Sequence, residues 1–191
     1  MVYQFVDKRK LDRMTDGENH QGVAAFAAAH KYADVSDILA AARAKNEPPF
    51  IIIADGLNDP HNLGSIIRSA NAAGAHGVII PKNRSVSLNS VVAKVSTGAV
   101  EYTPVARVTN IAQTIEKLKK EGLWICGTAL EASEDYFDAD LTGALAIVIG
   151  SEGEGISRIV RESCDFLVKI PMKGQTESLN ASVAAGILLY E

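Results

Sequence analysis

Phe50-Ile-Ile-Ile-Ala54 is a run of five apolar residues that ends at a polar turn. Five further apolar runs follow it, at residues 77–80, 102–108, 123–127, 145–149 and 166–170. Helical candidates lie between the runs, at residues 62–73, 87–97, 110–120 and 156–163. Near-continuous apolar strands separated by helices are typical of a mostly parallel sheet with helices on both faces. The sequence therefore predicts an α/β fold.

Two more helices and a less regular segment surround this pattern. Residues 34–44 have apolar side chains at helical spacing, with Asp34 or Ser36 available as the N-cap. A terminal helix is predicted at residues 181–189, where small side chains permit close packing. Residues 1–33 show no steady period, and we expect them to be a linker or the end of another domain. The main domain is expected to span residues 34–191.

The composition predicts one soluble domain. The chain has 191 residues, of which 47% are hydrophobic, so it can bury one substantial core. Its net charge of -4 gives no overall support for a nucleic-acid partner, which usually requires a basic surface. Cys126 and Cys164 belong to no metal-binding pattern, and we expect them to be buried free thiols and no metal to be bound. Since the chain shows no secretory signal and no apolar run as long as a membrane span, we expect a cytoplasmic protein.

Three polar stretches follow apolar runs, and in parallel sheets ligands bind beyond the carboxyl ends of the strands. The first stretch contains Asn62, Ser65 and Arg68, which lie on neighbouring turns of a predicted helix and can all face that edge. Two simpler interpretations, without a role in a site, stay open. Asn62 can be a helix cap, and Arg68 can be a surface arginine or the partner of a carboxylate at the sheet edge.

The second stretch, Gly150-Ser-Glu-Gly-Glu-Gly155, is rich in glycine. Its order differs from the dinucleotide fingerprint Gly-x-Gly-x-x-Gly, and Glu152 and Glu154 would repel a pyrophosphate. The stretch therefore indicates a loop for a neutral or cationic ligand, or a simple turn with solvated glutamates. The third stretch, residues 170–180, precedes the terminal helix, and its Ser178 and Asn180 can cap that helix or join a site at its N-terminus.

These stretches carry three motifs that resemble those of the SpoU/TrmH class of ribose 2'-O-methyltransferases. The motifs are Asn62-Leu-Gly-x-x-x-Arg68, Ile149-Gly-Ser-Glu-Gly-Glu-Gly155, and Ile170-Pro-Met with Ser178-Leu-Asn180-x-Ser182. Each motif is weak alone, but the three in this order are specific. Residues 16–23 also resemble the domain junction of the bacterial 23S rRNA guanosine-2'-O-methyltransferases.

The resemblance implies a fold, a cofactor and an activity. The fold would be the SPOUT fold, in which a parallel sheet ends in a C-terminal trefoil knot that binds S-adenosylmethionine. The protein would act as a homodimer with active sites near the interface, and residues 1–33 would be a linker or the remnant of an N-terminal RNA-binding domain. The implied reaction is methylation of a ribose 2'-hydroxyl in RNA, on a guanosine of 23S rRNA.

The resemblance also assigns roles to individual residues. Five positions match the polar and catalytic motif residues, namely Arg68, Asn62, Glu152, Ser178 and Asn180. Six match positions that line the cofactor, namely Thr128, Gly150, Ile170, Met172, Ser178 and Leu179. Because a guanidinium stays protonated in proteins, Arg68 either loses its proton transiently at a desolvated site or stays charged to bind a phosphate and stabilise the developing alkoxide. We favour the charged role.

The chain departs from the class at its N-terminus, where only about 30 residues precede the catalytic domain instead of a full RNA-binding domain. This indicates a truncated chain or a short natural variant, and RNA contacts would then fall to basic residues that are otherwise solvated surface. These are Lys82, Arg84, Lys94, Arg107 and the cluster at residues 8–13. The alternatives are a catalytically silent RNA-binding relative, a tRNA 2'-O-methyltransferase, and a different nucleotide-binding α/β enzyme, which Glu152 and Glu154 disfavour.

Overall fold

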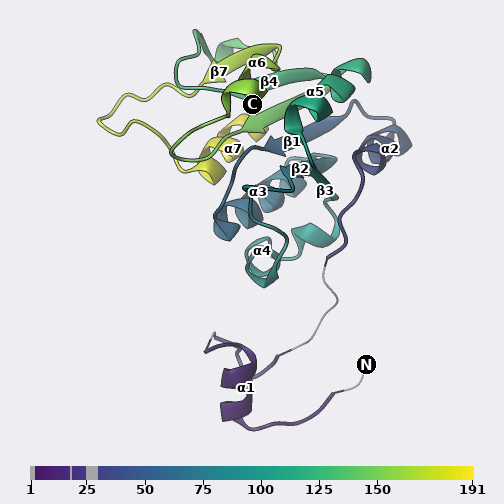
Figure 1. Cartoon of the computed structure of the whole chain (residues 1–191), viewed down its shortest axis with the longest axis vertical. Helices are drawn as coiled ribbons and strands as arrows, with labels where there is room; N and C mark the ends of the chain where they lie inside the picture. The colour runs from purple at the N-terminus through teal and green to yellow at the C-terminus, as the bar shows by residue number, and fades with distance from the viewer. Residues whose placement is uncertain (1–2, 18, 25–29) are drawn as a thin grey trace.

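The computed structural model describes residues 3–17, 19–24 and 30–191. Its centre is a seven-stranded sheet with the strand order β3-β2-β1-β6-β4-β7-β5, in which every pairing is parallel (Figure 1). The strands are β1 Phe50–Ala54, β2 Gly77–Pro81, β3 Val105–Val108, β4 Trp124–Thr128, β5 Glu134–Asp135, β6 Leu145–Ile149 and β7 Phe166–Lys169. The predicted α/β fold with a parallel sheet is confirmed.

Helices cover both faces of this sheet. The described helices are α1 Lys8–Met14, α2 Val35–Lys45, α3 Pro60–Ala72, α4 Ser90–Val95, α5 Ile111–Lys120, α6 Arg158–Glu162 and α7 Ala181–Leu189, with 3-10 turns η1 Ala99–Glu101 and η2 Tyr136–Asp138. Residues of α3, α4 and α7 pack on one face, and residues of α2, α5 and α6 pack on the other. Helices α3 and α7, far apart in the sequence, lie side by side (Figure 1).

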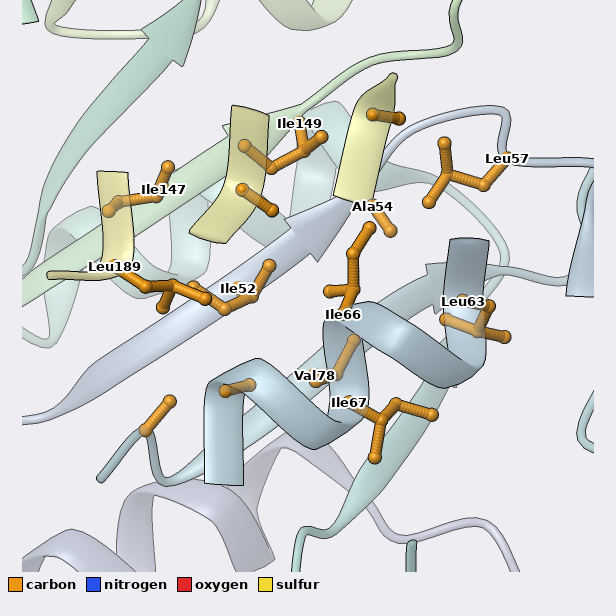
Figure 2. Close-up of a cluster of buried hydrophobic side chains, with 14 of the residues drawn as sticks. Ile52, Ala54, Leu57, Leu63, Ile66, Ile67, Val78, Ile147, Ile149 and Leu189 are labelled. Atoms are coloured by element: carbon orange, nitrogen blue, oxygen red, sulfur yellow. The ribbon is translucent and has the colours of Figure 1, made fainter. Parts of the chain in front are cut away.

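The core is apolar on both faces because successive side chains of a strand point to opposite sides. Figure 2 shows Ile52 and Ala54 of β1 on the face where α3 supplies Ile66 and α7 supplies Leu189. Ile51 and Ile53 of the same strand point to the face covered by α2 and α5. This two-sided burial explains why the strand reads as a continuous apolar run in the sequence.

Several elements differ from the sequence-based expectations. Strand β3 begins at Val105 rather than at Tyr102, because η1 and a turn occupy the residues before Pro104. Helix α4 is limited to Ser90–Val95, and its N-cap is Asn89. Helix α1 was not expected, since it buries none of its residues and is held at its start by the Asp7 cap. Strand β5 was also missed because it is two polar residues long.

The N-terminal segment joins the sheet at the β3 edge. The Ala33 amide donates to the Val105 carbonyl at 2.9 Å, and Ala33 forms a parallel bridge with Ala106. Just before it, the Tyr32 hydroxyl accepts a hydrogen bond from the Leu88 amide at 2.8 Å. The Arg107 guanidinium carbon lies 4.9 Å from the centre of the Tyr32 ring, which is a cation–π contact. Residues 32–33 are therefore fastened to the sheet and to the loop after β2.

Cys126 is buried and Cys164 is half-buried, and both are free thiols. Burial raises the pKa of each thiol to about 12, because the thiolate is disfavoured away from water. At pH 8 the thiolate fraction is then on the order of one in ten thousand, and the thiolate is the reactive form. We expect iodoacetamide to label neither cysteine of the native protein within minutes, and to label both in denaturing urea. Rapid labelling of the native protein would contradict this.

The described part of the chain has two further general properties. None of its helices is long and apolar enough to cross a membrane. Among the same residues, no group of three or more His, Cys, Asp or Glu side chains is placed to hold a metal ion.

Candidate active site at the carboxyl ends of β1, β6 and β7

The three polar stretches come together at one edge of the sheet. They follow β1, β6 and β7, and because all pairings are parallel, these strands end on the same side. The β1 stretch leads into α3, the β6 stretch forms the glycine loop at residues 150–155, and the β7 stretch leads into α7. Packing of α7 against α3 brings the first and last motifs together.

The glycine loop is a tight hairpin. The Ser151 amide donates to the Gly155 carbonyl at 3.1 Å, and the Gly155 amide donates back to the Ser151 carbonyl at 2.9 Å. Gly155 has a φ of +66°, a conformation that glycine adopts readily. A Cβ atom on Gly150 would overlap the backbone of Gly155, so only glycine fits there. The two glycines thus allow the backbone at residue 155 to pack directly against the backbone at residue 150.

A cavity of about 200 Å³ lies between the glycine loop, the end of β4 and the start of α7. Its lining includes all six residues expected to contact a cofactor: Thr128, Gly150, Ile170, Met172, Ser178 and Leu179. The Thr128 hydroxyl donates to the Val148 carbonyl at 3.0 Å. The structure therefore gathers these residues, from four separate segments, around one cavity.

Asn62, Glu152 and Asn180 form a hydrogen-bonded cluster beside the cavity. The Asn62 side-chain amide donates to Glu152 Oε1 at 2.8 Å, and the Asn180 amide donates to Asn62 Oδ1 at 2.8 Å and also to Glu152 Oε1. The backbone amide of Ala181 approaches the same carboxylate oxygen at 3.4 Å. Three donors thus converge on Oε1 of Glu152, and Oε2 accepts no hydrogen bond from the described residues. One motif residue from each stretch contributes to this cluster.

Asn180 also caps α7. Its Oδ1 accepts from the amides of Ser182 at 3.0 Å and Val183 at 3.3 Å, so the cap interpretation and the site interpretation hold together for this residue. Two other cap expectations are wrong. Helix α3 begins at Pro60 with Asp59 as its N-cap, so Asn62 is an interior, buried residue. Ser178 lies two residues before the cap position and lines the cavity.

Arg68 is not brought into this arrangement. It lies six residues after Asn62 on α3, which turns its side chain about 120° away around the helix. The residue is exposed and lies outside the cavity lining. Its guanidinium has no hydrogen bond or ion pair with any residue in the described ranges. The prediction that Asn62, Ser65 and Arg68 all face the strand edge is therefore wrong for Arg68.

An ion pair at the cavity was not anticipated from the sequence. Arg161 of α6 pairs with Glu131, which follows β4, and both residues line the cavity. Neither residue belongs to one of the three motifs, and their separation in the sequence gives no signal. The pair adds one charge of each sign to a wall that is otherwise mostly apolar.

The fold and this site define an α/β domain with a ligand cavity at the carboxyl ends of its strands. A sequence model described as the SpoU rRNA methylase family matches residues 49–190. A second model, described as RNA 2'-O ribose methyltransferase substrate binding, matches residues 1–33. Because the first match covers most of the chain, the protein belongs to the SpoU rRNA methylase family.

Curated relatives agree with this assignment. The Bacillus subtilis protein YacO, described as a TrmH family tRNA/rRNA methyltransferase, is 57% identical over 191 residues, which are 100% of this chain and 76% of the relative. A TrmH family tRNA/rRNA methyltransferase of Staphylococcus saprophyticus is 54% identical over the same 191 residues, again 76% of the relative. Family membership thus extends over the whole length of the chain.

Solved structures show the same fold. The SpoU methyltransferase AviRb from Streptomyces viridochromogenes, crystallised with the cofactor AdoMet (S-adenosylmethionine), matches with a TM-score of 0.69 and 34% identity over 73% of this chain. An AdoMet-bound rRNA methyltransferase from Sinorhizobium meliloti matches with a TM-score of 0.72 and 28% identity over 84% of this chain. The matched parts span 55% and 59% of those two crystal chains, a little more than half of each.

Proposed function

We propose that this protein transfers a methyl group from S-adenosylmethionine to a ribose 2'-hydroxyl of RNA, on a guanosine of 23S rRNA in the cytoplasm. The observation that carries the proposal is the convergence of the three motifs on one cavity, with Asn62, Glu152 and Asn180 hydrogen-bonded beside it. The 2'-O specificity is supported by the family of residues 49–190 and by the substrate-binding match at residues 1–33. The trefoil knot and the division into segments 1–33 and 34–191 are part of the same proposal.

The cavity fits S-adenosylmethionine chemically. This cofactor has an adenosine, a methionine carboxylate and ammonium, and a sulfonium that would supply the methyl group. Apolar side chains such as Ile170, Met172 and Leu179 would face the adenosine, with Gly150 in the same wall. Glu131 and Arg161 would match the charged methionine end. Glu152 would face the positive charge of the sulfonium, which is opposite in sign to its own.

In this mechanism Glu152 positions the attacking hydroxyl. A ribose 2'-hydroxyl must lose its proton as its oxygen bonds the methyl carbon and the carbon–sulfur bond breaks. Because three donors hold Oε1 of Glu152, its free Oε2 can accept a hydrogen bond from the 2'-hydroxyl. The amides of Asn62 and Asn180 fix the carboxylate in place, and the proton passes to the carboxylate or to water.

The proposal is tested by two measurements on the purified protein. Calorimetry with S-adenosylhomocysteine is expected to show binding at micromolar to millimolar ligand, and tritiated methyl transfer to 23S rRNA is expected to label ribose. Absence of binding at millimolar ligand would remove the proposal. Binding without transfer to 23S rRNA or tRNA would favour the catalytically silent relative, and transfer to tRNA alone would favour the tRNA methyltransferase.

We further propose that Arg68 completes the site of a partner copy in a homodimer. Arg68 of α3 is exposed and unpaired, and it lies outside the cavity of its own subunit. In this proposal a second subunit covers Arg68, and the guanidinium acts in the site of that subunit. There it would stay charged, bind the phosphate next to the target ribose and stabilise the developing alkoxide.

This arrangement predicts complementation between two inactive variants. Homodimers of Arg68→Ala and of Glu152→Ala are each expected to lose methyl transfer. Mixing them by co-expression should restore about a quarter of the wild-type sites, because half of the dimers are mixed and each mixed dimer has one intact site. Activity no higher than the sum of the separate variants would place Arg68 in its own subunit's site. Arg43→Ala, which removes an arginine from α2, is the control variant. Its homodimer should transfer methyl groups as well as the wild-type homodimer does.

A further inference from the structure

A second, larger cavity adjoins the first on the other side of the glycine loop. Its volume is about 970 Å³, and it is an open groove lined by the loops that follow β1, β2 and β3. Residues 151–155 line both cavities, so the glycine loop is a shared wall. Asn62 and Glu152 also face the second cavity. Because Glu152 lines both cavities, a group in this groove can reach the Glu152 side chain from the side that does not face the first cavity.

The polar groups of this groove suit a nucleobase. Asn58, Asn83 and Thr109 line it, and their side chains form no hydrogen bonds within the described ranges. Asp55 and Glu154 add carboxylates, and Arg84 adds a cation. Carboxylates repel phosphates, so a phosphodiester would stay at the Arg84 side while a neutral base with N–H donors enters the groove. Amide, hydroxyl and carboxylate groups together offer donors and acceptors for the edge of such a base.

The N-terminal segment reaches the sheet next to this groove. The substrate-binding match ends at residue 33, and Ala33 pairs alongside β3. Tyr32 bonds the Leu88 amide and lies under Arg107, whose Nη2 donates to the Lys82 carbonyl at 2.9 Å. Loop 82–88 is held at both ends by these contacts, and it presents Asn83 and Arg84 to the groove. The end of the substrate-binding match therefore contacts the loop that supplies Asn83 and Arg84 to the groove.

From these observations we infer that the groove between residues 55–59, 83–84 and 109–112 holds the target nucleoside of the RNA, with its base inside and its ribose against Glu152. The inference rests on the proposed function and adds the place of the substrate. In-line transfer requires the nucleophile and the leaving sulfur to lie on opposite sides of the methyl carbon, with the oxygen about 3–3.5 Å from that carbon. Glu152 lines both cavities, so a ribose in the groove and a cofactor in the first cavity would meet beside its carboxylate.

The test uses two substitutions in the groove that leave the cofactor cavity intact. Arg84→Gly removes the cation, and since Arg84 has a φ of +55°, glycine accepts its backbone conformation without strain. Asn58→Trp fills the groove from an exposed loop position. We expect kcat/KM for 23S rRNA to fall about 10-fold for Arg84→Gly and on the order of 100-fold for Asn58→Trp, as for a lost charged contact and a blocked subsite. The Kd for S-adenosylhomocysteine should stay within about twofold of wild type, as measured by calorimetry.

Lys117→Ala is the matched control, because Lys117 is an exposed cation on α5 that lines neither cavity. It should keep wild-type kcat/KM. Unchanged kcat/KM in both groove variants would overturn the inference, and so would an equal loss of cofactor affinity. If the wild-type protein transfers no methyl group to any RNA, the proposed function fails, and the inference fails with it. Transfer by wild type with normal groove variants overturns the inference alone.

Discussion

The Gly150→Ala protein is expected to be less stable than wild type and to bind S-adenosylmethionine at least 10-fold more weakly. A Cβ at position 150 would overlap the backbone carbon and oxygen of Gly155 and the amide nitrogen of Ile156. Backbone atoms cannot move aside as a flexible side chain can, so the hairpin between Ser151 and Gly155 would open. Overpacking of this kind costs about 1–3 kcal/mol, and for a protein of this size it should lower Tm by roughly 2 to 12 °C.

The same loop contains a matched control for this substitution. A Cβ on Gly153 would meet no atom within 4 Å, and its φ lies outside the left-handed region. Gly153→Ala should therefore keep the wild-type Tm. Differential scanning fluorimetry measures Tm, and calorimetry measures the cofactor affinity of Gly150→Ala. If Gly150→Ala and Gly153→Ala had the same Tm, the tight contact between residues 150 and 155 would not be needed for stability.

The second large effect is expected at Asn180, where one side chain has two separable roles. Serine caps helices about as well as asparagine, so Asn180→Ser should retain the bonds to the start of α7 while it removes the amide donor to Asn62 and Glu152. We expect its free energy of unfolding to stay within about 0.5 kcal/mol of wild type. Methyl transfer should fall on the order of 100-fold, as for a lost donor in a preorganised site.

Two further variants complete this test. Asn180→Ala removes both the cap and the donor, and should lose about 1 kcal/mol of stability in addition to the transfer activity. Asn89→Ser changes the N-cap of α4, which accepts from the Val92 amide at 2.9 Å and lies outside both cavities, so it should keep normal transfer. Urea unfolding and tritiated methyl transfer provide the readouts. Full activity in Asn180→Ser would reduce Asn180 to a helix cap.

The sheet could be predicted from the sequence wherever strands are buried on both faces. The bounds of β1, β6 and α7 agree with the expected ranges, because apolar runs and a polar flank mark both ends of each. Helix α1 and strand β5 could not be predicted in this way. Both are short and polar, and neither buries a side chain that would produce a hydrophobic period.

The sequence predicted which residues form the candidate site better than it predicted how they are arranged. The motifs indicated Asn62, Glu152 and Asn180, and the packing of α3 against α7 brings these side chains within hydrogen-bonding distance. The place of Arg68 could not be predicted, because the rotation of α3 about its axis follows from core packing at Leu63, Ile66 and Ile67. The ion pair between Glu131 and Arg161 depends on tertiary contacts that no local pattern reveals.

The strand order has a consequence for synthesis on the ribosome. Strand β1 pairs with β2, which follows soon after it, and also with β6, where Phe50 lies opposite Leu145 half a chain later. Until residues 145–149 have emerged, a nascent sheet of β1, β2 and β3 presents an unpaired apolar edge at β1. Pairing between such distant segments is slow, and open edges recruit strands from other chains. The β1 edge is therefore open to pairing with other chains during translation, before either cavity exists.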